Sequence, residues 1–415
     1  MPFALPVEAF RVTTLDSGAR IATEAIPGVA SISLGVWVRT GIAQETPSLA
    51  GITHFLEHMM FKGTERRTAR QIAEEVDQVG GVMNAFTERE FTAFFVRLLG
   101  DHWPLGVDLL TDILRHPRLD AADVTRERQV VLEEINQYED SPDELVHDLF
   151  TQTLWEGHPL GRSLLGTKET VAALDQPSVR GHFEEHYRPA NMVVAAAGIV
   201  DHDALVAAFA PHLQGGGPIE TENGAVLPKS GHRERFERRK TEQVHFCVGS
   251  SGYAYDDPKR YTLAVLDTAL GGGMSSRLFQ EIRENRGLVY SIGSFSASYR
   301  RGGFFVVSGG TSPSHWDQVR ALIHEEITRA RSQGLTAEEL ARVKEHIKGS
   351  LALAMESTSY RMRRLASSMI YYDRPISMQE IFDEVDGVTD AALREVAAEV
   401  LSDDALTIAA IGPVQ

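Results

Sequence analysis

Cysteine is nearly absent from this sequence. Cys247 is the single cysteine in 415 residues, so the chain cannot close an internal disulfide, and a lone thiol is typical of a protein from a reducing compartment. No apolar run approaches the ~18 residues that a membrane span requires, and the N-terminal stretch has no basic start followed by apolar residues. These absences predict a cytoplasmic protein without a membrane partner, although a processed organellar protein would share them.

Basic residues are also in the minority. The chain has 41 Lys and Arg against 58 Asp and Glu, which gives a formal net charge of −17. A surface of this sign repels phosphate backbones and attracts cationic peptides or metal ions, so we expect no nucleic-acid partner. Simple solubility is the alternative explanation of the same excess. The chain is 43% hydrophobic and 24% charged, as in globular proteins, and its length predicts two or three domains.

The chain reads as two similar halves joined by a segment rich in Gly and Pro. On each side of "QGGGPIETENGAVLPKSG" (214–231), a β-like opening precedes a helix, a strand pair, and a helix that begins with His-Trp, at His102 and at His315. A repeat of this size predicts duplication of an α+β unit, because solenoid repeats are only ~20 to 50 residues long. We therefore expect an N-terminal domain at 1–214, a linker at 215–230 and a related C-terminal domain at 231–415.

The first candidate site is "HFLEH", residues 54–58. Ser48 is the expected N-cap of its helix and Gly63 the expected end. The rest of this helix is apolar all round, which predicts burial, and buried imidazoles cost several kcal/mol unless a metal or hydrogen bonds satisfy them. His54 and His58 project from one face and suit a zinc ion, while Glu57 can reach a water on that ion without being a ligand.

Catalytic zinc needs a third protein ligand and one open position. The helix predicted within 123–142 places Glu127, Val131, Glu134 and Tyr138 on one face. Two carboxylates on an otherwise apolar stripe suit a ligand, Glu134, and a supporting acid, Glu127. Ordinary solvated glutamates are the alternative, since the helix carries other charges, and periodicity alone leaves both interpretations open.

The pattern occurs a second time as "HFEEH", residues 182–186. Here the segment follows Pro177, is interrupted by Gly181 and is surrounded by charged residues. We expect most of its surface to be in contact with water, so no burial penalty calls for a metal. His182 and His186 are therefore expected to be structural.

The quoted motifs resemble the pitrilysin family of zinc peptidases, in the branch that contains mitochondrial processing peptidase and its bacterial single-chain relatives. "HFLEHMMFKGT" (54–64) is similar to the family's active-site helix. The family's third zinc ligand stands 76 positions after the second histidine, which selects Glu134, and its supporting acid seven residues earlier selects Glu127. The same test on the second motif selects Thr262, which is no ligand.

Two further segments share the resemblance. "GGVMNAFTEREFTAFF" (80–95) resembles the family's substrate-binding edge strand, which implies peptide contacts at Asn84, Ala85 and Phe86. "SRLFQEIRENRGLVYSIGSF" (276–295) resembles the segment whose Arg and Tyr bind the substrate carbonyl or the oxyanion, which implies Arg283 and Tyr290 as catalytic groups. We expect Gly287 to end the helix that carries Arg283, and Tyr290 to lie on the next strand.

The resemblance implies a clamshell of two α/β-sandwich halves and a zinc endopeptidase. One Zn²⁺ per chain would be held by His54, His58 and Glu134, with Glu57 as the base that activates water. Short or unfolded peptides, favoured when basic, are the expected substrates, and a homodimer is the expected assembly. The alternatives are a noncatalytic scaffold subunit of the same fold and the zinc-binding subunit of a heterodimeric processing peptidase.

Overall fold

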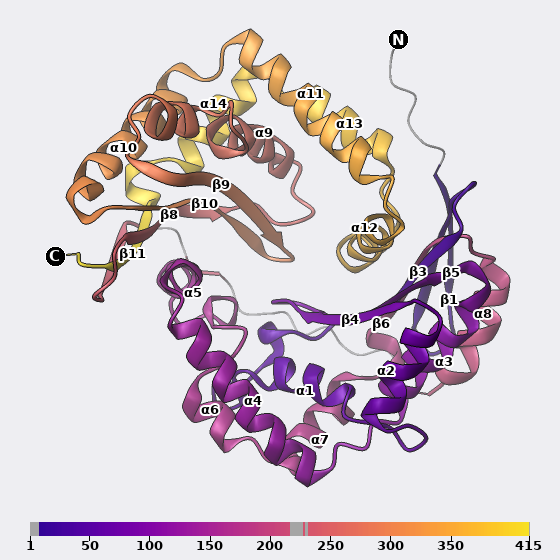
Figure 1. Cartoon of the computed structure of the whole chain (residues 1–415). Helices are drawn as coiled ribbons and strands as arrows, with labels where there is room; N and C mark the ends of the chain where they lie inside the picture. The colour runs from indigo at the N-terminus through magenta and orange to yellow at the C-terminus, as the bar shows by residue number, and fades with distance from the viewer. Residues whose placement is uncertain (1–7, 216–226, 229–230, 415) are drawn as a thin grey trace. The chain divides into compact units, whose positions relative to one another are not determined.

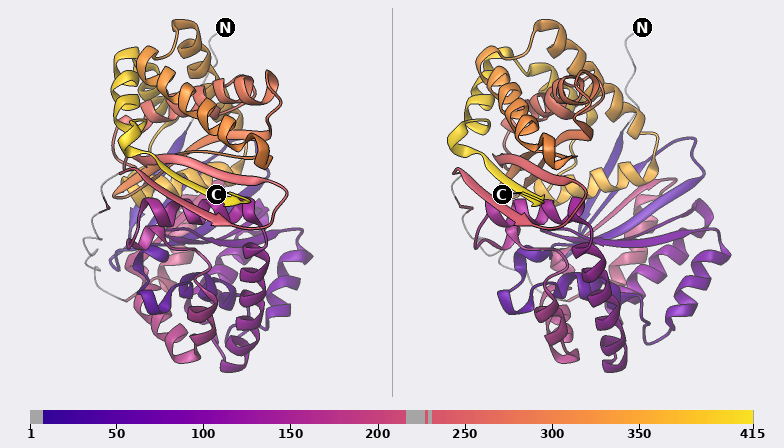
Figure 2. Two further views of the ribbon diagram at one scale, coloured as in Figure 1. Left: turned by 90° about the vertical axis from the view of Figure 1, so that its left-hand side faces the viewer. Right: turned by 60° about the vertical axis from the view of Figure 1, so that its left-hand side comes forward.

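The computed structural model of the protein describes residues 8–215, 227–228 and 231–414 (Figures 1 and 2). The expected linker, residues 215–230, lies almost entirely outside the described residues. Two compact units form, and both are discontinuous in the chain. The first comprises Met1–Ile135, Ser163–Gly224 and Ala352–Ser377, and the second comprises Asn136–Arg162, Ala225–Leu351 and Met378–Gln415.

A six-stranded sheet is the centre of the first unit, with the strand order β1-β2-β6-β3-β5-β4. Its pairs are antiparallel except for the parallel pair β2·β6. Every residue of β6, "MVVAAAG", is buried, as expected of a central strand that is covered on both faces. The strands are β1 (Ala9–Thr14), β2 (Arg20–Ala25), β3 (Ser31–Val38), β4 (Val82–Thr87), β5 (Thr92–Leu99) and β6 (Met192–Gly198).

Helices cover both faces of this sheet (Figure 1). On one face the main hydrophobic core of the unit contains Phe55 of α1, Leu110 of α3 and Val131 of α4. On the other face a smaller core joins Trp37 and Phe95 to the single helix α12. The helices of the first face are α1 (Ile52–Met60), α2 (Ala69–Gln78), α3 (Trp103–Arg115), α4 (Ala121–Glu139), α6 (Lys168–Ala173), α7 (Gln176–His186) and α8 (His202–Phe209), and α12 spans Thr358–Tyr371.

The second unit repeats this plan with a five-stranded sheet in the order β7-β11-β8-β10-β9. The strands are β7 (Arg233–Arg238), β8 (Val244–Gly252), β9 (Val289–Tyr299), β10 (Gly302–Thr311) and β11 (Thr407–Gly412). Its helices are α5 (Pro142–Leu154), α9 (Lys259–Gly271), α10 (Trp316–Gln333), α11 (Ala337–Ala354), α13 (Met378–Gly387) and α14 (Asp390–Val400). Both sheets join one parallel pair, β2·β6 or β7·β11, to a run of antiparallel strands, so β4 and β9 are equivalent terminal strands. The predicted mixed α/β architecture with two related halves is confirmed.

The two halves of the chain exchange one helix. Helix α5 precedes residues 215–230 in sequence but packs on β8 and β11 of the second sheet, and α12 follows them but packs on β3 and β6 of the first. At α12 the exchange includes a buried ion pair, because Arg361 Nε donates to Glu24 Oε1 at 2.9 Å and both side chains are almost inaccessible to solvent. Removing one partner of such a pair would leave an uncompensated buried charge, which is strongly destabilising.

Among the described residues, no helix has both the length and the apolar composition needed to cross a lipid bilayer.

Candidate metal centre

Helix α1, which carries the first motif, begins at Ile52. Ser48 does not cap it, so that prediction is wrong: Ser48 lies in a separate 3-10 turn, Pro47–Leu49. The position before the helix is Gly51, with φ of 91°, and a Cβ there would lie 2.5 Å from the carbonyl oxygen of Leu165. Glu45 supplies the cap instead, because its two carboxylate oxygens accept the backbone N–H groups of Gly51 and Thr53, each at 2.9 Å.

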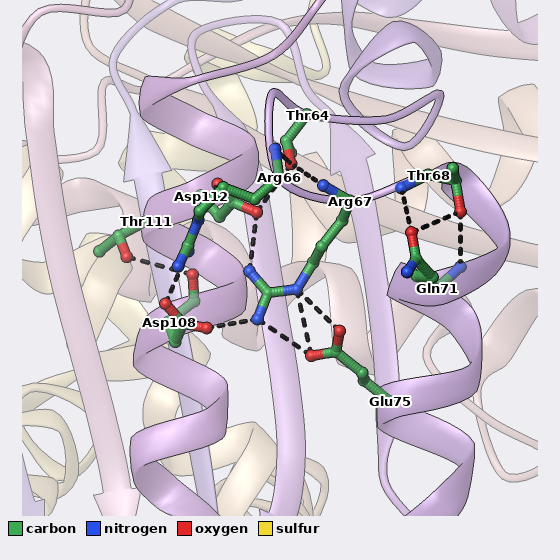
Figure 3. A network of polar contacts seen from close by, with 9 residues as sticks. All are labelled: Thr64, Arg66, Arg67, Thr68, Gln71, Glu75, Asp108, Thr111 and Asp112. Carbon is green, nitrogen blue, oxygen red and sulfur yellow. Dashed lines mark hydrogen bonds and ion pairs between the residues drawn. The ribbon is translucent and has the colours of Figure 1, made fainter.

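After α1 the chain enters residues 61–68, here called the exit loop. Gly63 adopts φ of 123°, so the helix cannot continue. Figure 3 shows how ion pairs tie this loop to α2 and α3. Arg67 donates to Glu75 of α2 at 2.9 Å and to Asp112 of α3 at 2.7 Å, and Thr64 donates to the fully buried Asp112 at 2.8 Å. Both ends of α1 are therefore anchored to the surrounding structure by carboxylates.

Three potential metal ligands meet where α1 faces α4. The imidazole Nε2 atoms of His54 and His58 each lie 3.7 Å from a different carboxylate oxygen of Glu134. The two imidazole rings are 4.6 Å apart between centroids. One ligand atom from each of these three residues lies within 4.8 Å of the other two. Among the described residues, this is the one group of three His, Cys, Asp or Glu side chains that meets this distance.

These residues fit a zinc ion chemically. Two ligand atoms at about 2.0 to 2.2 Å from a tetrahedral ion lie about 3.3 to 3.6 Å apart. The 3.7 Å separations found here are close to that range and are too long for direct hydrogen bonds between the side chains. Nδ1 of His54 is buried and has no hydrogen-bond partner. The imidazole is almost buried, with 12% of its side chain exposed, so coordination through Nε2 would offset part of the cost of enclosing it.

Glu127 fixes the orientation of His58. Nδ1 of His58 donates to Glu127 Oε1 at 2.8 Å, and the second oxygen, Oε2, accepts from Lys62 Nζ at 2.6 Å. Burial opposes ionisation of Glu127, but the hydrogen bonds from His58 and Lys62 outweigh it and lower the pKa of this carboxyl. An ionised carboxylate can only accept, so Nδ1 of His58 is the donor in this contact, and in the neutral imidazole the lone pair is then on Nε2.

The two histidines differ in their affinity for protons. Burial, assisted by the charge of His58, lowers the pKa of His54 to about 3, so this imidazole is neutral near pH 7. Burial also acts to lower the pKa of His58, but the hydrogen bond to Glu127 and the charges of Glu134, Glu127 and Glu57 prevail and raise it. A metal ligand must offer a lone pair, which His54 does without losing a proton.

Glu57 lies beside these ligands with a partner of its own. Its Oε2 accepts a hydrogen bond from Thr87 Oγ1 of β4 at 2.6 Å. Burial raises the pKa of Glu57, and the bond from Thr87 offsets part of that effect. A carboxyl with a raised pKa is suited to accepting and returning a proton near neutral pH.

Three residues around this centre were missed in the sequence: Glu45, Lys62 and Thr87. Lys62 could have been found, because it stands four residues after His58 and so one helical turn along the same face. Thr87 lies two positions after Ala85, on the strand face that meets α1. Nothing local in the sequence identifies Glu45 as a cap, because it acts across six and eight residues.

The second motif forms a regular helix rather than an interrupted one. Helix α7 passes through Gly181 without a break. His182 is buried, with 5% of its surface exposed, so the prediction that this segment is mostly in contact with water is wrong at this residue. Its Nε2 lies 3.2 Å from Thr53 Oγ1, and burial together with the charge of His186 lowers its pKa to about 3. A hydroxyl partner, in place of a metal, thus accounts for this histidine.

The remaining predicted residues lie on the two equivalent terminal strands and beside them. Asn84, Ala85 and Phe86 are on β4, which has a strand partner on one side only in the sheet order. Arg283 lies in the last turn of a short π-helix, Phe279–Glu284, in the second unit, and Gly287 adopts φ of 63° after it. Tyr290 follows on β9, as predicted, with 82% of its surface exposed. The guanidinium carbon of Arg283 lies 5.7 Å from the centroid of the Tyr290 ring.

Comparisons with known proteins identify the family of the chain and its fold. Residues 20–168 match the family described as Insulinase (Peptidase family M16), and residues 173–347 match the Peptidase M16 inactive domain. An uncharacterized zinc protease of Streptomyces coelicolor is 40% identical over 413 residues, covering 98% of this chain and 90% of its own. One from Bacillus subtilis is 38% identical over 403 residues, covering 96% and 97%. A protease from Helicobacter pylori has the same fold, with a TM-score of 0.91 at 21% identity over 98% of this chain and all of its own.

The two motifs can be separated by metal content. We expect His58→Ala and Glu134→Gln to lower zinc affinity by more than the about 10- to 100-fold typical of losing a supporting residue, because each removes a direct ligand. His186→Ala is the matched control and should leave zinc binding unchanged. Zinc per chain is measured by elemental analysis after dialysis against a weak chelator. Loss of zinc in His186→Ala with retention in His58→Ala would reverse the assignment.

Proposed function

Because this chain belongs to the insulinase (M16) family of peptidases, whose curated relatives are named zinc proteases, we propose that it is a zinc endopeptidase acting on short or unfolded peptides. The observation that carries the proposal is the convergence of His54, His58 and Glu134, with Glu57 beside them. The set has three protein ligands, which leaves one position of a tetrahedral ion open for chemistry. The inactive-domain match begins at residue 173, after all four of these residues in the sequence.

Each residue of the centre has a separate task in peptide hydrolysis. When bound, one Zn²⁺ per chain supplies Lewis acidity, which polarises the scissile carbonyl and lowers the pKa of a water. Glu57 accepts the proton of the attacking water at its carboxylate and returns it to the departing amine nitrogen as the C–N bond breaks. Thr87 holds the Oε2 atom of that carboxylate, and Glu127 holds the ring of His58.

The substrate would bind as an additional strand along β4. A terminal strand presents unpaired N–H and C=O groups, to which an extended peptide can add, and Asn84, Ala85 and Phe86 would make these contacts. Thr87 supports this placement because it connects β4 directly to Glu57. A peptide on β4 would then lie next to the base that acts on it.

Arg283 and Tyr290 are our proposed donors to the substrate carbonyl or to the oxyanion that develops from it. The observations that support these roles concern the second unit by itself. The exposed Tyr290 ring and the Arg283 guanidinium lie side by side there, so both can turn toward a ligand.

We further propose that the enzyme is a cytoplasmic homodimer, because one chain contains both the ligand set and the Arg283–Tyr290 pair. The single, buried Cys247 supports a reducing compartment. Light scattering on the purified chain and fractionation of the source cells test these two points. A monomer, or an exported protein, would contradict them.

The role of Glu57 is tested by replacing it with Gln, which has the same shape but cannot accept the proton. We expect Glu57→Gln to keep its zinc and to lose about 10²- to 10⁴-fold in kcat. Cleavage of an internally quenched peptide by zinc-loaded wild type and variant measures this loss. A variant as active as wild type would exclude Glu57 as the base.

The same assay separates the proposal from its rivals. Wild type that cleaves the peptide when purified alone excludes a noncatalytic scaffold and a subunit that depends on a different partner chain. Wild type that is zinc-loaded and folded but inactive alone would favour one of those two alternatives.

Basic peptides should be preferred, because the net charge is −17 and the ligand-bearing helix α4 adds Glu133 and Glu139 near Glu134. Salt screens such attraction, with a Debye length of about 10 Å at 0.1 M and about 3 Å at 1 M ionic strength. Raising the salt should therefore lower kcat/KM for a basic peptide more than for a neutral peptide of equal length. Equal responses of the two peptides would contradict electrostatic selection.

A further inference from the structure

Lys62 is a basic side chain that contacts the carboxylate bonded to His58. Its ammonium lies 2.6 Å from Oε2 of Glu127, while Oε1 of the same carboxylate accepts from Nδ1 of His58 at 2.8 Å. The Glu127 side chain is 5% exposed, so solvent can do little to orient it. Each of its two oxygens therefore has a protein donor, and the carboxylate bridges Lys62 to His58.

The position of Lys62 is set by the chain on both sides of it. Its backbone N–H donates to the carbonyl of Met59 at 3.1 Å, which holds Lys62 in a turn directly after α1, four residues beyond His58. Gly63 and Thr64 come next, and Thr64 is anchored to Asp112 in the network of Figure 3. The exit loop thus holds Lys62 in place against α4.

We propose that Lys62 is a positioning residue of the metal centre, which holds Glu127 so that the carboxylate accepts Nδ1–H of His58 and leaves Nε2 of His58 free to bind zinc. The inference rests on the proposed function, because it assumes that zinc is the ion held at this centre. It makes Lys62 the outer member of a Lys62–Glu127–His58 chain of contacts, in which the lysine acts on His58 through the carboxylate.

A lysine is suited to this task because Glu127 would otherwise be a nearly buried anion balanced only by a histidine that must supply a lone pair. The ammonium provides a full positive charge and a hydrogen bond to the oxygen that His58 does not use. Partners that orient a ligating histidine typically change metal affinity by about 10- to 100-fold when removed. We expect a loss of zinc affinity of that size when Lys62 is removed, since Lys62 holds the carboxylate that orients His58.

The experiment measures zinc affinity, by chelator competition with metal-stripped and reloaded protein, in addition to peptide cleavage. The variants are Lys62→Met, Lys62→Arg, Glu127→Gln and the double variant Lys62→Met/Glu127→Gln. Lys348→Met is the matched control, because Lys348 pairs with Glu345 at 2.7 Å and Asp386 at 2.9 Å in the second unit. Thermal unfolding of the metal-free proteins shows that each variant is folded.

We expect Lys62→Met to lose about 10- to 100-fold in zinc affinity, Lys62→Arg to restore it, and Lys348→Met to leave it unchanged. In the Glu127→Gln background the Lys62→Met change should cost nothing more, because the lysine acts through that carboxylate. Wild-type affinity in Lys62→Met, or an equal loss with and without Glu127, would overturn the inference while leaving the zinc site intact. Wild type that binds no zinc would overturn the proposed function itself.

Discussion

The structure of the site depends on the contact between α1 and α4, because the ligand set is divided between these two helices. His54 and His58 belong to α1 and Glu134 to α4, so a shift of either helix along the other would separate the 3.7 Å contacts that bring them together. Carboxylates oppose such a shift at both ends of α1: Glu45 caps the first turn, and Asp112 and Glu75 hold the exit loop. Glu127 adds a direct bond between the two helices, to His58.

The two sheets share one topology apart from the additional strand β1 of the first. The equivalent terminal strands β4 and β9 carry the proposed peptide contacts and the exposed Tyr290, respectively, while the ligand set, among the residues that the structure describes, occurs in the first unit. The exchange of α5 and α12 means that each sheet is covered by a helix encoded on the other side of residues 215–230. Neither half of the sequence contains a whole compact unit, so a chain cut between residues 214 and 231 would leave part of each hydrophobic core uncovered.

Local sequence predicted the parts of the site that depend on one helix. The spacing of His54 and His58 and the apolar composition around them were sufficient to predict a partly buried histidine pair, and the stripe through Glu127 and Glu134 predicted a shared face. Joining the two helices needed the family resemblance, because no periodicity relates residues 76 positions apart. The errors have the same origin: Gly51 and Glu45 replace Ser48 as the cap, and Thr53 from another helix covers His182. Contacts between segments that are distant in the sequence determine both the cap of α1 and the burial of His182, and a local sequence pattern carries no information about such contacts.

The central claim is that one zinc ion is bound between α1 and α4. Crystals of the zinc-loaded protein, with diffraction measured on both sides of the zinc absorption edge, test it directly. The account predicts one anomalous peak per chain, in contact with Nε2 of His54, Nε2 of His58 and a carboxylate oxygen of Glu134. A peak beside His182 and His186, or a Glu134 carboxylate turned away from the ion, would contradict it.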